Sequence, residues 1–155
     1  MIAIEQITKE DIIQDYITAL NNPEINKYLN TKEATKESIM RYIKSVDDSN
    51  GYMFKVIKYI DYHRHDKEFM IGTATLKNID WNIGSADIGV MVWELGKGYG
   101  SLAILEIIKF CKNTGLIKLN LGVNPSNYRA IKCYKNLGFK ETEILMELDL
   151  NTHQD

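Results

Sequence analysis

The sequence contains little cysteine and no long apolar run. Its 155 residues include only two cysteines, Cys111 and Cys133, and both lie in segments with helical patterning. This fits reduced thiols in the cytoplasm better than a disulfide framework. No window approaches the roughly 18 consecutive apolar residues of a membrane span. The N-terminal segment is charged from Glu5 onward, so we expect no signal peptide.

An excess of one charge is also absent. The formal net charge is −2 at pH 7, which gives no reason to expect nucleic acid or an anionic membrane as a partner. The chain has no internal repeat and no linker rich in proline, glycine or serine. We therefore expect a single domain over residues 1–155, which is long enough to bury a core.

The spacing of apolar residues predicts helices and strands in alternation. Three consecutive strands should pair antiparallel, and the crossover helix that follows should place the next strand parallel. We expect an α+β fold: a mixed, mostly antiparallel sheet with a central parallel strand pair and helices on both faces. The predicted strands are 2–7, 52–60, 69–79, 85–93, 117–123 and 142–150, and the predicted helices are 8–20, 35–46, 99–113 and 126–139.

Three glycines alternate in "ELGKGYG", between a predicted strand and a predicted helix. A glycine turn that leads into a helix N-terminus is a place to bind phosphate. The turn does not fit the P-loop pattern. Gly98, Gly100 and Ala103 fit the dinucleotide pattern G-x-G-x-x-A, but that pattern needs an acidic residue for the ribose at the end of the next strand, and from the predicted strand 117–123 onward no Asp or Glu occurs before Glu141. A purely structural turn is a further alternative, although a hairpin or a cap needs only one or two glycines.

A second pattern lies downstream, in "VNPSNYRAIKCYKNLGF". Asn127, Ala130, Tyr134, Gly138 and Phe139 form N-x-x-A-x-x-x-Y-x-x-x-G-F. Together with the glycine turn, this pattern resembles the GNAT superfamily of acyl-CoA-dependent N-acetyltransferases. The segment "IGTATLKNIDWNIGSADIGVMV" is similar to the branch that contains ribosomal-protein and amino-sugar acetyltransferases.

The resemblance implies acetyl-CoA as co-substrate and no metal. The family's pyrophosphate turn is [QR]-x-x-G-x-G/A, and Leu95 replaces its first residue here, which removes one side-chain contact. Free N–H groups at the start of the helix would bind the pyrophosphate, and the preceding strand would pair with pantetheine. The implied coenzyme-binding residues are Val90, Met91, Val92, Lys97, Gly98, Tyr99, Gly100, Ser101 and Asn127.

The resemblance also implies catalytic roles for Tyr134 and Asp87. Tyr134 would protonate the departing thiolate, since a phenol keeps its proton at neutral pH. The pattern alone favours a core position for Tyr134, in a helical stripe with Ala130 and Leu137, and the flanking motif reverses that preference. Asp87 occupies a position where many relatives carry a glutamate base, and it also fits a half-exposed strand carboxylate. Asn127 fits a helix N-cap as well as a coenzyme contact.

Other charged residues carry less specific signals. His63 and His65 form H-x-H in a charged turn without a partner cluster, so we expect no metal there. Lys132 and Lys135 could reach the adenosine phosphates, but a solvated helix face explains both.

The resulting prediction is a cytoplasmic enzyme that moves acetyl from acetyl-CoA to a primary amine. The branch resemblance favours a nucleotide-linked amino sugar as acceptor. A protein N-terminus and a non-catalytic acyl-CoA-binding module are the alternatives, and a homodimer is left open. Residues 22–35 should recognise the acceptor, with Lys27 and Lys36 on its diphosphate. Candidate lining residues are Asn22, Glu24, Asn26, Tyr28 and Trp81.

Overall fold

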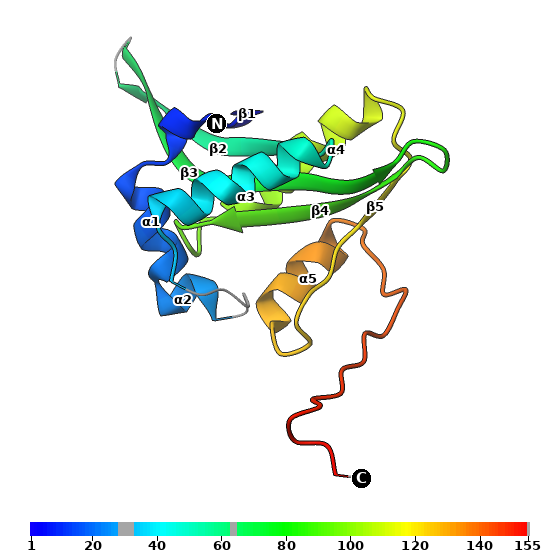
Figure 1. Cartoon of the computed structure of the whole chain (residues 1–155). Coiled ribbons are helices and arrows are strands. Elements are labelled where there is room, and N and C mark those ends of the chain that lie inside the picture. Colours follow the sequence, from blue (N-terminus) through cyan, green and yellow to red (C-terminus); the bar gives the residue numbers. More distant parts are fainter. Residues whose placement is uncertain (28–32, 63–64, 155) are drawn as a thin grey trace.

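A five-stranded sheet in the order β1-β2-β3-β4-β5 forms the centre of the molecule. The computed structural model describes residues 1–27, 33–62 and 65–154 (Figure 1). The strands are β1 (Ile2–Gln6), β2 (Tyr52–Tyr62), β3 (His65–Asp80), β4 (Ser85–Val92) and β5 (Lys118–Asn120). Neighbours from β1 to β4 pair antiparallel, and β4 pairs with β5 in parallel. The predicted mixed α+β sheet is confirmed, with its parallel pair at one edge instead of the centre.

The helices are η1 (Lys9–Asp11), α1 (Gln14–Asn21), α2 (Pro23–Asn26), α3 (Lys36–Asp48), α4 (Tyr99–Lys112) and α5 (Tyr128–Asn136). The Thr8–Asp11 capping box forms, but it starts only a single 3-10 turn. Extended backbone at Ile13 then separates this turn from α1, so the helix predicted over 8–20 is divided. In the described part of the chain, none of these helices has the length and hydropathy needed to cross a membrane.

Helices cover both faces of the sheet, as predicted (Figure 1). Phe54 and Val56 of β2 pack in one cluster with Ile104 and Ile107 of α4. Met53, which alternates with them along the strand, packs in a second cluster with residues of α1 and α3. This division follows from strand geometry, because successive side chains point to opposite faces.

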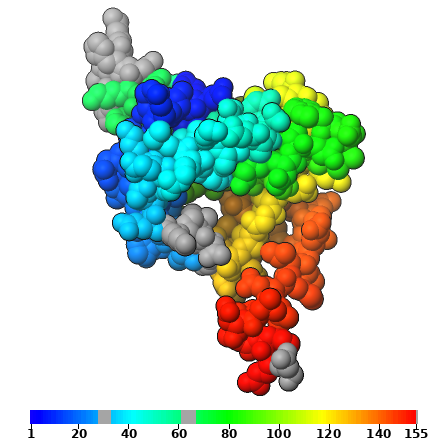
Figure 2. Space-filling view, in the orientation of Figure 1, coloured from blue at the N-terminus to red at the C-terminus, as the bar shows by residue number. Residues whose placement is uncertain are grey.

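The strand predicted over 142–150 is wrong. The structure has no strand there, and the side chains of Ile144, Leu145 and Met146 are 84%, 98% and 85% exposed. Figure 2 shows the C-terminal residues as a narrow extension from the rest of the molecule. Alternating apolar residues give a segment strand character, but a strand also needs a neighbouring edge to pair with. None of the described residues provides that pairing for this segment, so the sheet ends at β5.

Deleting residues 142–155 should leave the free energy of unfolding of the monomeric chain unchanged within about 0.5 kcal/mol, because the segment buries no apolar side chain against the rest of its own chain. Urea unfolding of both chains measures this difference. The control is Ile107→Ala in the full chain. Ile107 is fully buried in α4, and its truncation should cost about 2–5 kcal/mol. A loss from the deletion as large as the loss from Ile107→Ala would show that the segment packs.

Candidate functional site

A cleft of about 1010 Å³ lies beside β4. One side is formed by the glycine turn, the start of α4, residues 121–124 and α5. The opposite side is formed by residues of the three N-terminal helices α1, α2 and α3, together with two residues of β3. The cleft therefore extends from a helix N-terminus to a region built by the first third of the chain.

The cleft exists because β4 and β5 separate. They pair only where Ser85–Asp87 lies beside Lys118–Asn120. From Ile88 to Val92, β4 keeps its pairing with β3 but has no strand on its other side in the described part of the chain. Main-chain N–H and C=O groups along that side remain available to a ligand. The predicted pantetheine-binding residues Val90, Met91 and Val92 all line the cleft.

The glycine turn leads directly from this open edge of β4 into α4. Gly96 and Gly98 have φ angles of +76° and +75°, and Gly98 is the N-cap of α4. A Cβ on Gly98 would meet no heavy atom within 4 Å, so backbone conformation requires glycine there. No side chain caps this helix end, and its first N–H groups have no partner within the helix. The helix start is therefore suited to an anion.

The turn residues predicted to bind the coenzyme divide into two groups. Gly98, Tyr99, Gly100 and Ser101 line the cleft. Lys97 is exposed and is not part of the lining. The structure therefore offers the main chain of the helix start to the ligand, with the Lys97 side chain outside the cleft.

Tyr134 faces the same cleft from α5. Its ring packs edge-on against Phe139, with the ring centroids 5.9 Å apart. Burial, with a smaller effect of Cys133, raises the pKa of the Tyr134 phenol above its ordinary value. The phenol is therefore neutral at physiological pH and able to donate a proton. Tyr134 also packs against the hydrophobic core. The two positions considered for it, in the core and at the coenzyme, are therefore compatible.

Two polar contacts fix the start of α5. The Asn127 side chain accepts a hydrogen bond from the Ala130 N–H at 3.2 Å, which makes it the N-cap that its position suggested. Asn127 also lines the cleft, so its amide nitrogen can face a ligand. The Ser101 Oγ lies 2.8 Å from the Cys133 Sγ and links the first turn of α4 to α5. Neither cysteine forms a disulfide within the described residues.

Asp87 lies apart from this group. It is half-buried on β4 opposite Lys77 of β3, and it is not among the residues that line the cleft. Its Oδ2 accepts a hydrogen bond from the Asn78 Nδ2 at 2.8 Å. The structure therefore brings Tyr134 to the coenzyme-binding residues but does not bring Asp87 there.

The other end of the cleft is lined by hydroxyl groups. Thr73 and Thr75, both 7% exposed, are the two buried polar side chains in the described part of the chain, and both face the cleft. Tyr16 stacks on Trp93 at 5.7 Å, and burial raises the pKa of its phenol to about 12 despite a hydrogen bond with Thr73. Ser38 lines the same end. Sequence reasoning missed Thr73 and Thr75, because their alternation with apolar residues is equally typical of a solvated strand face.

The residues predicted to recognise the acceptor have mixed placements. Glu24 and Lys27 line the cleft. Asn22 instead caps α2, and the Asn26 side chain donates a hydrogen bond to the Leu20 carbonyl at 2.9 Å. Trp81 is 54% exposed in the turn between β3 and β4. The remaining candidate, Tyr28, lies outside the described residues, and Lys36 is exposed and is not part of the lining.

The lysines of α5 have the surface positions expected of them. Lys132 is exposed, and the Lys135 Nζ lies 3.2 Å from a Glu141 carboxylate oxygen. His63 lies outside the described residues. Among those that are described, no group of three or more His, Cys, Asp or Glu residues could hold a metal ion.

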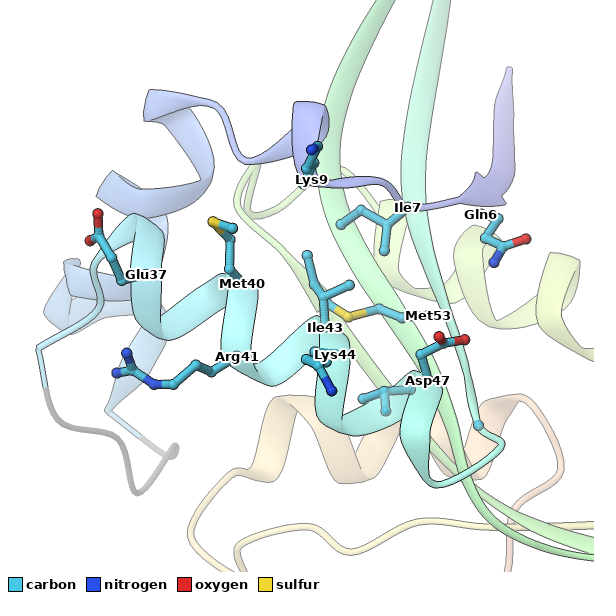
Figure 3. Close-up of a pocket in the computed structure, with 12 residues that line it drawn as sticks. Gln6, Ile7, Lys9, Glu37, Met40, Arg41, Ile43, Lys44, Asp47 and Met53 are labelled. Atoms are coloured by element: carbon cyan, nitrogen blue, oxygen red, sulfur yellow. The ribbon is translucent and has the colours of Figure 1, made fainter.

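A second hollow of about 580 Å³ lies between α3 and the segment that follows β1 (Figure 3). Its apolar floor contains Ile7, Ile43 and Met53, and charged side chains such as Arg41 surround it. It contains none of the residues that the sequence predicted for the site. We assign the function to the cleft beside β4.

Comparison with known proteins identifies the family. The family model of the acetyltransferase (GNAT) domain matches residues 2–140. Acetyltransferase PseH of Campylobacter jejuni is 29% identical over 121 residues, which cover 77% of this chain and 71% of that protein. Other curated relatives match over shorter parts, and the chain spans 15% of MJ1062 of Methanocaldococcus jannaschii and 41% of the uncharacterized N-acetyltransferase YycN of Bacillus subtilis.

Solved structures share the fold. A domain from Methanocaldococcus jannaschii is 26% identical with a TM-score of 0.71, covering 92% of this chain and 90% of that chain. Spermidine N-acetyltransferase of Vibrio cholerae, solved in complex with CoA and spermine, is 22% identical with a TM-score of 0.77, covering 95% and 85% of the two chains.

Replacing Gly98 by valine should abolish the stabilisation of the fold by acetyl-CoA, because a β-branched residue does not adopt the left-handed backbone that opens the helix start. At one hundred times its dissociation constant, acetyl-CoA should stabilise the wild-type chain by about 2.7 kcal/mol. Thermal unfolding with and without the ligand measures this shift.

Gly115→Val is the matched control. Gly115 has a φ of +90°, a Cβ added to it would meet no heavy atom within 4 Å, and it lies beyond the opposite end of α4. Both variants should lose about 1–2 kcal/mol of stability from backbone strain, but only Gly98→Val should lose the ligand shift. Equal shifts in the two variants would contradict the assignment of the glycine turn.

Proposed function

This chain belongs to the GNAT acetyltransferase family, and we propose that it transfers acetyl from acetyl-CoA to the primary amine of a nucleotide-linked amino sugar. The main support is the composition of the cleft. It joins an anion-binding helix start and an unpaired strand edge to an acceptor end lined by buried hydroxyl groups. A coenzyme with a diphosphate and an extended amide arm matches the first two features.

The proposed transfer is direct. The neutral amine attacks the carbonyl carbon of the thioester, and an N–H group on the open edge of β4 stabilises the oxyanion. The carbon–sulfur bond then breaks, and the Tyr134 hydroxyl donates its proton to the departing thiolate. Tyr134 suits this role because it faces the cleft from the helix that packs beside the start of α4.

The amine must lose a proton before it attacks. Asp87 is our proposed acceptor of that proton, and its position outside the cleft lining requires water to carry the proton to it. The hydrogen bond that the Asn78 side chain donates fixes the orientation of the Asp87 carboxylate. An amine with a pKa near 8 is already partly neutral at physiological pH, so it needs little help from a base.

The acceptor end favours a neutral, hydroxyl-rich group. Thr73 and Thr75 offer hydroxyls, while the rings of Tyr16 and Tyr42 add aromatic surface. Such a lining suits a sugar ring, because it provides both hydrogen-bonding groups and apolar faces. Lys27 lies at the same end and suits the diphosphate of a nucleotide-linked sugar.

Domain organisation, location and assembly complete the proposal. We propose one domain over residues 1–155, working in the cytoplasm, where the unpaired Cys111 and Cys133 stay reduced. We also propose a homodimer, and the exposed apolar side chains of residues 144–150 favour association.

Tyr134→Phe should lower kcat by roughly 10²–10⁴ while the dissociation constant of CoA stays nearly unchanged, since the ring remains and only the proton donor is lost. Because burial raises the pKa of Tyr134, an alkaline decline in wild-type rate that comes from its ionisation should lie at higher pH than an ordinary phenol would give. Steady-state kinetics and calorimetric CoA binding provide the two readouts. Wild-type activity in Tyr134→Phe would limit Tyr134 to a role in packing.

The acceptor is tested with a panel of UDP-linked amino sugars, peptides with free N-termini, and spermidine, while release of the CoA thiol is followed. We expect turnover with an amino-sugar nucleotide. We also expect Thr75→Val, which keeps the side-chain volume, to raise the KM for that acceptor about tenfold, the cost of one lost hydrogen bond. Turnover confined to peptides or spermidine would contradict the amino-sugar proposal, and CoA binding without turnover of any amine would favour a binding module.

A further inference from the structure

Arg129 occupies a position in the cleft that the sequence patterns did not identify. It is the second residue of α5, it is exposed, and it lines the cleft. Its Nη2 lies 3.6 Å from the position that a Cβ on Gly96 would take. The guanidinium from α5 therefore sits directly beside the glycine turn that leads into α4.

Among the described residues that line the cleft beside the turn, Arg129 is a cation that no carboxylate pairs with. Glu94 lines the cleft just before the turn, and both of its carboxylate oxygens accept hydrogen bonds from the Lys58 Nζ at 2.7 Å. The same Lys58 Nζ lies 5.5 Å from the centre of the Tyr99 ring. Lys58 thus offsets the negative charge of Glu94. In the described part of the chain, no carboxylate pairs with Arg129.

The turn itself supplies no charged side chain to the cleft. Leu95 is apolar, and Lys97 is exposed outside the lining. Main-chain N–H groups can bind one side of a diphosphate, but they carry only partial charges. A guanidinium presents paired N–H donors that match two phosphate oxygens and also carries a full positive charge.

We propose that Arg129 binds the diphosphate of the coenzyme across the glycine turn, opposite the N–H groups of α4. This inference rests on the proposed function only in that the coenzyme is an acyl-CoA. The Arg129 guanidinium, which comes from α5, replaces the side-chain contact that Leu95 in the turn cannot make.

The contact also links coenzyme binding to the position of Tyr134, which α5 carries. The residues of α5 are at most half-buried, and the contacts that hold the helix include the packing of Tyr134 against the core and the one between Ser101 and Cys133 at 2.8 Å. A diphosphate bound by both α4 and Arg129 adds another attachment. Arg129 is therefore a binding residue that also positions the proposed acid.

Calorimetric titration of the full chain with CoA and with pantetheine, which lacks the diphosphate, tests this assignment. Arg129→Gln should raise the dissociation constant of CoA about 10- to 100-fold, the range expected for a hydrogen bond to a charged group, and should leave pantetheine binding within about twofold. Lys132→Gln is the matched control. It removes the same charge from an exposed position on the same helix, outside the cleft lining, and should change CoA binding less than about threefold.

Wild-type CoA affinity in Arg129→Gln would overturn the proposal, as would equal losses for CoA and pantetheine or equal effects of the two substitutions. Wild-type protein that binds no CoA would instead overturn the proposed function, so the two failures are distinguishable. Thermal unfolding without ligand confirms that each variant is folded before the titrations are compared.

Discussion

The separation of β4 from β5 is the constraint on which the rest of the site depends. Three residue pairs hold the two strands together, and beyond Asp87 the main chain of β4 pairs with β3 alone within the described residues. A sheet edge of this kind is costly when it is buried without partners, so a ligand that supplies hydrogen bonds is favoured there. The same separation places the chain after β5 and helix α5 on the far side of the cleft (Figure 1).

The electrostatics of the cleft follow from the same geometry. The positive end of α4 begins where β4 ends, with Gly98 supplying the backbone conformation that turns one into the other. A carboxylate close to this anion site would oppose binding, and the ion pair between Lys58 and Glu94 limits that effect. Burial keeps the proton on Tyr134 at the other side of the cleft. In the proposed function, strand separation, the helix dipole and a neutral phenol act on the thioester from different elements.

Much of the fold was predictable from local patterns, because the elements that form are those with strong periodicity or clear turn chemistry. The glycine turn and α5 were recognisable in the sequence, and the structure places Tyr134 and most of the predicted coenzyme-binding residues around one cleft. The segment 142–150 shows the limit of prediction from local patterns, because alternating apolar residues do not specify which strand edge a segment pairs with. Arg129 and Tyr16 were missed for a related reason, because their positions in the cleft depend on long-range packing. In the sequence, Arg129 is equally typical of an exposed charge and Tyr16 of an apolar helical stripe.

Amide hydrogen–deuterium exchange in the presence and absence of acetyl-CoA tests the central claim, that the open edge of β4 and the start of α4 together bind the coenzyme. We predict slower exchange on ligand addition for residues 88–92 and 99–101, with no change in β1 or in residues 142–154. Protection around the hollow between α3 and β1 (Figure 3), with no change along β4, would contradict the account.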